Sequence, residues 1–177
     1  MIKLYTHFLV VFVVLGYAAS TTFSQTFQSL DDASRNLQEA FNKAALVEFK
    51  KAEKKNMDLV VQYTKTIEMN PSDFQALANR AETYQKLQRY TEAIADYTKI
   101  IESNGEDLNA YNRRALFYSS QQKYTEAIAD YTKVIELNPK DANAYYSRGL
   151  AYKALGKTKQ AYADGAKAKS LGYKLKQ

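Results

Sequence analysis

The chain has 177 residues, of which 46% are apolar and 25% are charged, and its formal net charge is +6. This balance predicts one folded domain with its own hydrophobic core and excludes an intrinsically disordered chain. The absence of cysteine excludes disulfide bonds, thiolate nucleophiles and cysteine metal sites.

The first 24 residues have the layout of a secretory signal peptide. Lys3 precedes the unbroken apolar run FLVVFVVL at residues 8–15, and small residues follow the run. The run is shorter than the about 20 apolar residues that a membrane-spanning helix needs. We expect cleavage after Ser24, with cleavage after Ser20 as the alternative, and a secreted or periplasmic mature protein with no transmembrane anchor. An uncleaved anchor or a buried N-terminal helix is the competing interpretation.

The only histidine, His7, lies in this segment, so the mature chain would contain neither histidine nor cysteine. That excludes Ser–His and Cys–His catalytic pairs and the usual nitrogen and sulfur metal ligands. The glycines further along are scattered singly and form no phosphate-binding loop. We therefore expect no catalytic residue, no metal and no cofactor. A carboxylate-dependent enzyme is the third hypothesis, after the two binding functions given below.

Residues 25–39 are expected to form an N-terminal extension. Within it, the sequence SLDD at residues 29–32 is typical of a capping box at the start of a helix. Residues 40–73 follow, and we predict that they form two helices, 40–55 and 56–71.

The decapeptide YTEAIADYTK occurs at residues 90–99 and again, letter for letter, at residues 124–133, so the sequence repeats with a period of 34. The period defines three units, each with two segments whose apolar residues have helical spacing. The units are 74–107, 108–141 and 142–175, with a tail at 176–177. Each unit is predicted to be a pair of helices.

Small residues alternate with tyrosines along the predicted helices, as the close packing of paired helices requires. In the middle unit the expected buried residues are Ala110, Ala115 and Tyr118 of the first helix and Ala127, Ile128, Tyr131, Val134 and Ile135 of the second. Arginines and aspartates recur in step with the period, and we predict ion pairs that join the two helices of each unit: Arg80, Arg114 and Arg148 with Asp96, Asp130 and Asp164.

These residues resemble the pattern of the tetratricopeptide repeat family, which has the same period. Tyr111 and Tyr145 stand where the family often has tryptophan, Ala115 and Gly149 match its small residue, Tyr118 and Tyr152 its aromatic residue, Ala127 and Ala161 its alanine, and Pro139 its closing proline. The resemblance covers residues 40–175 and makes 40–73 a degenerate repeat, because Val47 and Lys50 replace the small residue and the aromatic one. It implies an all-α fold, a right-handed α-solenoid of stacked antiparallel helix pairs.

The unit at 142–175 is predicted to be the terminal one. Three positions that are apolar in the preceding units change in it: Tyr97 and Tyr131 to Gly165, Tyr90 and Tyr124 to Thr158, and Ile101 and Ile135 to Lys169. Terminal repeats of a solenoid need a polar outer face. These changes therefore suit a unit that ends the stack.

The resemblance also implies a concave groove, lined by the outward faces of the first helices, in which the family binds peptides or helices of partner proteins. In this chain that face carries Gln75, Asn79, Glu82, Asn109, Asn112, Arg113, Leu116, Asn143, Tyr146 and Lys153. Asparagine amides can hydrogen-bond a peptide backbone, and Arg113 can hold a carboxylate. We predict a protein or peptide ligand there. The competing interpretation is a solvated face without a specific ligand.

The C-terminal end is strongly basic. Residues 142–177 carry eight basic residues and one acidic residue, a net charge of +7, whereas residues 25–141 have a net charge of −2. The second candidate site is a basic patch of Lys157, Lys159, Lys167 and Lys169, whose partner would be an anionic component of the cell envelope. Its competing interpretation is a charged cap that keeps the stack soluble. Predicted export disfavours nucleic acid. An exported scaffold is the first hypothesis, and docking through this basic end is the alternative.

Overall fold

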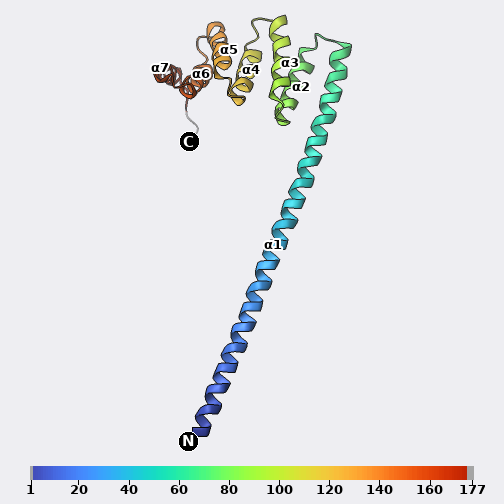
Figure 1. Ribbon diagram of the computed structural model, residues 1–177. Coiled ribbons are helices and arrows are strands. Elements are labelled where there is room, and N and C mark those ends of the chain that lie inside the picture. Colours follow the sequence, from blue (N-terminus) through green and yellow to red (C-terminus); the bar gives the residue numbers. More distant parts are fainter. Residues whose placement is uncertain (1, 175–177) are drawn as a thin grey trace. The chain divides into compact units, whose positions relative to one another are not determined.

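The computed structural model describes the backbone of residues 2–174 and the side chains of residues 25, 28, 29 and 31–174. Seven helices and no strand occur in this described part of the chain (Figure 1). The all-α prediction is therefore confirmed. The side chains of the expected signal segment, residues 1–24, lie outside the described ones, so the signal peptide stays a prediction.

The chain divides into two compact units, residues 1–52 and 53–177. The first unit is formed by the N-terminal part of α1, which runs from Ile2 to Met69. The second contains the end of α1 and three helix pairs (Figure 1): α2 (Phe74–Lys86) with α3 (Tyr90–Ser103), α4 (Leu108–Ser120) with α5 (Tyr124–Leu137), and α6 (Ala142–Ala154) with α7 (Thr158–Ser170). Helix α3 also packs on α4 and α5 on α6, so successive pairs stack into a solenoid.

Helix α1 corrects the prediction for residues 25–73. The expected turn between helices 40–55 and 56–71 is absent, and no helix begins at residues 29–32, because α1 continues through both places. The physical reason is local. No glycine or proline occurs between Gly16 and Pro71, so nothing in the sequence interrupts the helical hydrogen bonds.

Only the end of α1 takes a place in the stack. Val60 and Ile67 are buried, with exposed fractions of 7% and 8%. All side chains from 31 to 55 are exposed, among them the large apolar Phe41 and Phe49. Of the degenerate repeat predicted at 40–73, therefore, Val60 and Ile67 of the second half are buried in the stack, and no turn separates the two expected helices.

Each first helix of the stack begins and ends in the same way. Asp73, Asp107 and Asp141 accept a hydrogen bond from the backbone N–H three residues on, at 2.8, 2.9 and 3.0 Å. Such a cap contributes about 1 kcal/mol. The turn to the second helix passes through the left-handed region at Gln88, Gln122 and Gly156, a conformation that only the glycine adopts without strain. The caps and turns fix the length of each first helix.

The core of the stack follows the predicted alternation of small and large residues. In the middle unit Ala110, Ala115, Ala127, Tyr131 and Val134 are buried, as expected. Tyr118, Ile128 and Ile135 are only half-buried. The sequence analysis missed Phe117, which is 1% exposed because it turns toward α3 of the preceding unit, where its ring lies 5.7 Å from that of Tyr97.

The hydroxyl of Tyr97 is buried, and no hydrogen-bond partner for it occurs among the described residues. Burial is the main cause that raises the pKa of Tyr97 from 10.0 to about 12, and Glu82 adds to it. The native state therefore favours the neutral phenol. In the unfolded chain the phenol titrates near pH 10, so its contribution to stability is complete below that pH and is lost between about pH 10 and pH 12.

We expect Tyr97→Phe to raise the free energy of unfolding at pH 7 by about 1–2 kcal/mol, because it removes a buried donor without a partner. It should also flatten the loss of stability above pH 10. Urea unfolding followed by circular dichroism, at pH 7 and above pH 10, measures the free energy of unfolding of the variant and of wild type. Tyr131→Phe is the matched control, since the Tyr131 hydroxyl is hydrogen-bonded to Ser119 and Ser147 and its removal should bring no gain. A loss of stability in Tyr97→Phe would contradict the account.

Candidate partner-binding surface

The ten residues predicted to line the groove all lie on the first helices α2, α4 and α6, and none of them is buried. Five are exposed: Gln75, Asn109, Leu116, Asn143 and Lys153. The other five are half-buried: Asn79, Glu82, Asn112, Arg113 and Tyr146. The structure thus gives each first helix a set of these side chains that solvent, and hence a ligand, can reach.

Two polar contacts already join some of these residues to one another. Gln75 donates a hydrogen bond of 3.0 Å to the Asn79 side chain on the same helix. Arg113 of α4 forms an ion pair with Glu82 of α2, with 3.3 Å between Nη2 and Oε1. Both partners of this pair are more than a third exposed, so a ligand carboxylate could compete with Glu82 for Arg113 at little cost.

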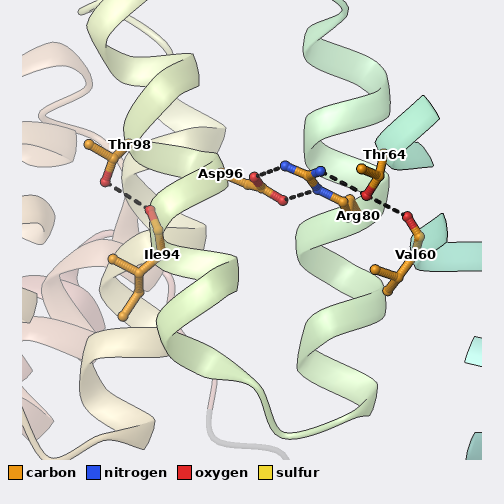
Figure 2. Close-up of polar contacts among 6 residues, drawn as sticks. All are labelled: Val60, Thr64, Arg80, Ile94, Asp96 and Thr98. Carbon is orange, nitrogen blue, oxygen red and sulfur yellow. Dashed lines mark hydrogen bonds and ion pairs between the residues drawn. The ribbon is translucent and has the colours of Figure 1, made fainter. Parts of the chain in front are cut away.

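Under this face, a repeated set of buried polar contacts holds the first helices in place. Arg80 of α2 binds Asp96 of α3 through two hydrogen bonds, 2.9 Å from Nε to Oδ2 and 2.6 Å from Nη2 to Oδ1 (Figure 2). Arg114 with Asp130 and Arg148 with Asp164 repeat the geometry. The predicted ion pairs are therefore confirmed, and they are more buried than the sequence indicated, with 4–8% of each aspartate side chain exposed.

Each arginine also reaches back to a threonine of the preceding second helix, a partner that the sequence analysis missed. Arg80 Nη1 donates to Thr64 Oγ1 at 2.9 Å, and that hydroxyl donates to the Val60 carbonyl at 2.8 Å. Figure 2 shows these residues together with Asp96. Thr98 and Thr132 do the same for Arg114 and Arg148. The signal was present in the sequence, because these threonines recur with the period of the repeat.

The arginines thus join three helices at every level of the stack. The hydrogen bond to the aspartate is the main cause that raises the pKa of each arginine, against the opposing effect of burial. Bidentate pairs fix orientation as well as distance. The ten residues predicted to line the groove therefore lie on helices whose orientation these arginine–aspartate bonds help to fix.

Three family models match the sequence, at residues 62–95, 115–156 and 142–171, and their descriptions are "Tetratricopeptide repeat" for the first and third and "TPR repeat" for the second. Together they cover just over half of the chain. The chain belongs to the tetratricopeptide repeat family. The first match begins inside α1 and ends inside α3, so it includes the end of α1 as part of a repeat. Tetratricopeptide repeats form protein-interaction scaffolds, and that role applies to this chain.

Solved structures of MamA have a similar fold. One crystal structure of MamA is 24% identical, with a TM-score of 0.61 over 64% of this chain and 66% of that one, which is just under two thirds of its length. A second is 24% identical, with a TM-score of 0.62 over 69% of each chain. MamA 41-end from Desulfovibrio magneticus RS-1 is 19% identical, with a TM-score of 0.62 over 66% of each chain. Identities this low support the fold alone. No curated protein matches the sequence at a significant level.

At the C-terminal end of this tetratricopeptide repeat protein, Tyr146 and Lys153 of the predicted groove line one cavity with Lys169 of the predicted basic patch. A cavity of about 510 Å³ between α6 and α7 is lined by small residues and by Tyr146, Leu150, Lys153, Tyr162 and Lys169. All four patch lysines are exposed, and the ammonium group of Lys157 lies 6.0 Å from the centre of the Tyr152 ring. Tyr146 stacks on Tyr173 of the C-terminal tail, with ring centres 4.1 Å apart.

Two features are absent from the described residues. No group of three or more His, Cys, Asp or Glu side chains that could hold a metal ion occurs among them. The same described part of the chain contains no helix that is both long and apolar enough to cross a membrane. What the surface does present is hydrogen-bonding amides, an arginine and an exposed leucine, groups that suit binding.

Proposed function

We propose that the protein is exported and acts as a scaffold that binds an extended segment or a helix of a partner protein along α2, α4 and α6. The observation that carries the proposal is the access of solvent to all ten face residues on three successive first helices. A ligand that contacts all three helices gains binding free energy from each unit. The buried arginine–aspartate pairs keep the helices of these units in a fixed arrangement. Export rests on the signal-like segment at residues 1–24.

The chemistry of the face suits a peptide backbone. Asn79, Asn109, Asn112 and Asn143 each offer a donor and an acceptor, which is what an extended backbone needs on both of its edges. Leu116, 48% exposed in the middle helix, offers an apolar contact among them. Arg113 can exchange Glu82 for a carboxylate of the ligand. The partner is therefore expected to be a protein segment with an acidic residue near an apolar one.

A crosslinking pull-down from cells tests this proposal. The groove variant combines Asn109→Ala, Asn112→Ala, Arg113→Ala and Tyr146→Ala. The control variant changes four exposed residues of the second helices: Lys99, Glu102, Thr125 and Glu126 to alanine. We expect the groove variant to bind its partner at least about tenfold more weakly, a difference of about 1.4 kcal/mol in binding free energy. The control variant should bind the partner like wild type. The intact mass of the scaffold protein recovered from the same cells also gives the position of signal-peptide cleavage.

Two further observations complete the test. Thermal unfolding of the groove variant must remain within a few degrees of wild type, because a misfolded variant would lose any partner. Equal recovery of the partner by the groove variant and by wild type would refute binding along α2, α4 and α6.

The exposed lysines of α7 support a second candidate, docking on an anionic component of the cell envelope. Lys169 shares its cavity with Lys153, so the basic patch is continuous with the end of α6. The variant with Lys157, Lys159, Lys167 and Lys169 changed to glutamine should then lose the partner while the groove variant keeps it. Binding to a polyanion should also collapse as salt rises from about 0.1 M to about 1 M, since screening shortens the reach of charge.

A further inference from the structure

Helices α1 and α7 each carry exposed apolar side chains that no described residue covers. On α7, Tyr162 is 79% exposed, and Gly165 and Ala166 are exposed beside it in the cavity of about 510 Å³. On α1, Phe41, Leu46 and Phe49 are 70%, 52% and 66% exposed. Exposed apolar side chains gathered on one face mark an interaction site. The question is whether the two surfaces fit each other.

The junction between α3 and α4 shows how a second helix receives the first helix of the next unit. Arg114 donates to Thr98 at 3.1 Å. Phe117 packs against two tyrosine rings of α3, with centre distances of 6.2 Å to Tyr90 and 5.7 Å to Tyr97. Gln121 donates to Thr91 at 2.8 Å. Three residues of the incoming helix thus meet four residues of the receiving one.

The same positions can be found at the two ends by counting along the period. Two periods after Thr98, Tyr90, Tyr97 and Thr91, helix α7 carries Ala166, Thr158, Gly165 and Lys159. Two periods before Arg114, Phe117 and Gln121, helix α1 carries Leu46, Phe49 and Glu53. Both sides of the junction have therefore changed, and the new residues can be compared pair by pair.

Each changed pair remains complementary. Leu46 would meet Ala166, so an apolar contact replaces the hydrogen bond between Arg114 and Thr98. Phe49 would enter the space that Gly165 leaves open, and a Cβ added to this glycine would meet no atom within 4 Å.

The third pair, Glu53 with Lys159, would be an ion pair in place of the hydrogen bond between Gln121 and Thr91. Seven residues after Glu53, helix α1 carries Val60, with Thr64 and Ile67 at further steps of four and three, and these are the residues that α1 uses in its own stack. Residues 40–55 therefore have the pattern of a first helix made for a junction like that on α7.

We propose that residues 40–55 of one copy pack on α7 of a second copy, in the place of the next first helix, and so continue the stack from molecule to molecule. The contact joins two different surfaces, so each molecule in a pair still has one of the two surfaces unoccupied. Further copies can therefore add, which builds chains or a closed ring. Residues 40–55 also carry five lysines against two glutamates, and α7 is basic. The apolar contact must act against this like charge, which about 0.3 M salt screens.

Sedimentation velocity of the protein isolated after expression of the full chain tests the proposal, at about 0.3 M salt. Wild type should show mass that rises with concentration. Phe49→Glu, which puts a charge in the contact, and Gly165→Lys, which fills the open space, should each weaken association about 30-fold or more, the loss typical of a central contact. The matched controls are Val47→Glu and Ala163→Lys, at exposed positions turned away from the contact, and both should assemble like wild type.

Mixing the two defective variants is the decisive step. Phe49→Glu keeps an intact α7 and Gly165→Lys keeps an intact α1, so their mixture should form one-to-one dimers and nothing larger. The charge exchange tests the register: Glu53→Lys and Lys159→Glu should each weaken assembly, and the two combined in one chain should restore it.

Other occupants of these surfaces give other results, each of which overturns the proposal. A monomeric wild type at all concentrations would mean that residues 40–55 fold back on their own chain or bind another protein. Assembly that survives Gly165→Lys but not Phe49→Glu would mean that α1 pairs with α1. Assembly unaffected by Phe49→Glu would exclude residues 40–55 altogether.

Discussion

Replacing Phe117 with alanine is expected to lower the free energy of unfolding by about 3–5 kcal/mol, the range for a large aromatic side chain removed from a core. Phe117 is 1% exposed and packs on Tyr90 and Tyr97 of the preceding unit. Truncation would leave a cavity between α3 and α4 that the rigid helices cannot close. Without the ring, the packing between the unit that ends with α3 and the unit that begins with α4 should be weakened.

Leu116→Ala is the matched control, because Leu116 is the next residue in the chain and is 48% exposed. It should change stability by no more than about 0.5 kcal/mol, and it should weaken partner binding if the proposed face is used. Urea unfolding followed by circular dichroism measures both variants. A loss below about 1 kcal/mol for Phe117→Ala would contradict the packing described between α3 and α4.

Removing the carboxylate of Asp130 should cost a similar amount, about 3–5 kcal/mol, because it leaves the Arg114 guanidinium buried without its counter-charge. Asp130 is 5% exposed and accepts two hydrogen bonds from Arg114, at 2.8 and 2.7 Å. Changing both residues to apolar ones, Arg114→Met with Asp130→Leu, should recover much of the loss, since no buried charge then remains.

The exposed pair of Asp31 and Arg35 provides the comparison. Its atoms approach to 3.0 Å, close to the distances in the buried pair, but the two side chains are 60% and 63% exposed. Asp31→Ala should therefore change the free energy of unfolding by less than about 1 kcal/mol. Equal effects of Asp130→Ala and Asp31→Ala on the free energy of unfolding would show that burial of the arginine–aspartate pairs does not increase their contribution to stability.

Residues that repeat with the period could be predicted from the sequence, because an unchanged residue at an unchanged spacing solves the same packing problem in each unit. Arg114 with Asp130 is such a case, and the structure confirms the pair. Thr98 belongs to the same pattern but was missed, since a lone threonine on a helix has no evident partner until its neighbour in space is known.

Features that differ between units were harder to predict. Phe117 stands where the two neighbouring units have Thr83 and Ala151, so those units gave no reason to place an aromatic ring at this position. The prediction of a separate helix at residues 40–55 was wrong for a related reason. Leu59, Tyr63 and Pro71 match the second half of a repeat, and the prediction supplied the missing first half, whereas the uninterrupted sequence favours one long helix. Which face binds a ligand depends on exposure, which the sequence alone does not determine.

Photocrosslinking in cells tests directly whether a partner binds along the first helices. A photoreactive amino acid at Leu116 stands on the proposed partner-binding face of α4, and one at Thr125 stands on an exposed part of α5. The account predicts that a partner protein is captured through position 116 and not through position 125. Capture through 125 alone, or through both positions equally, would contradict binding along the first helices.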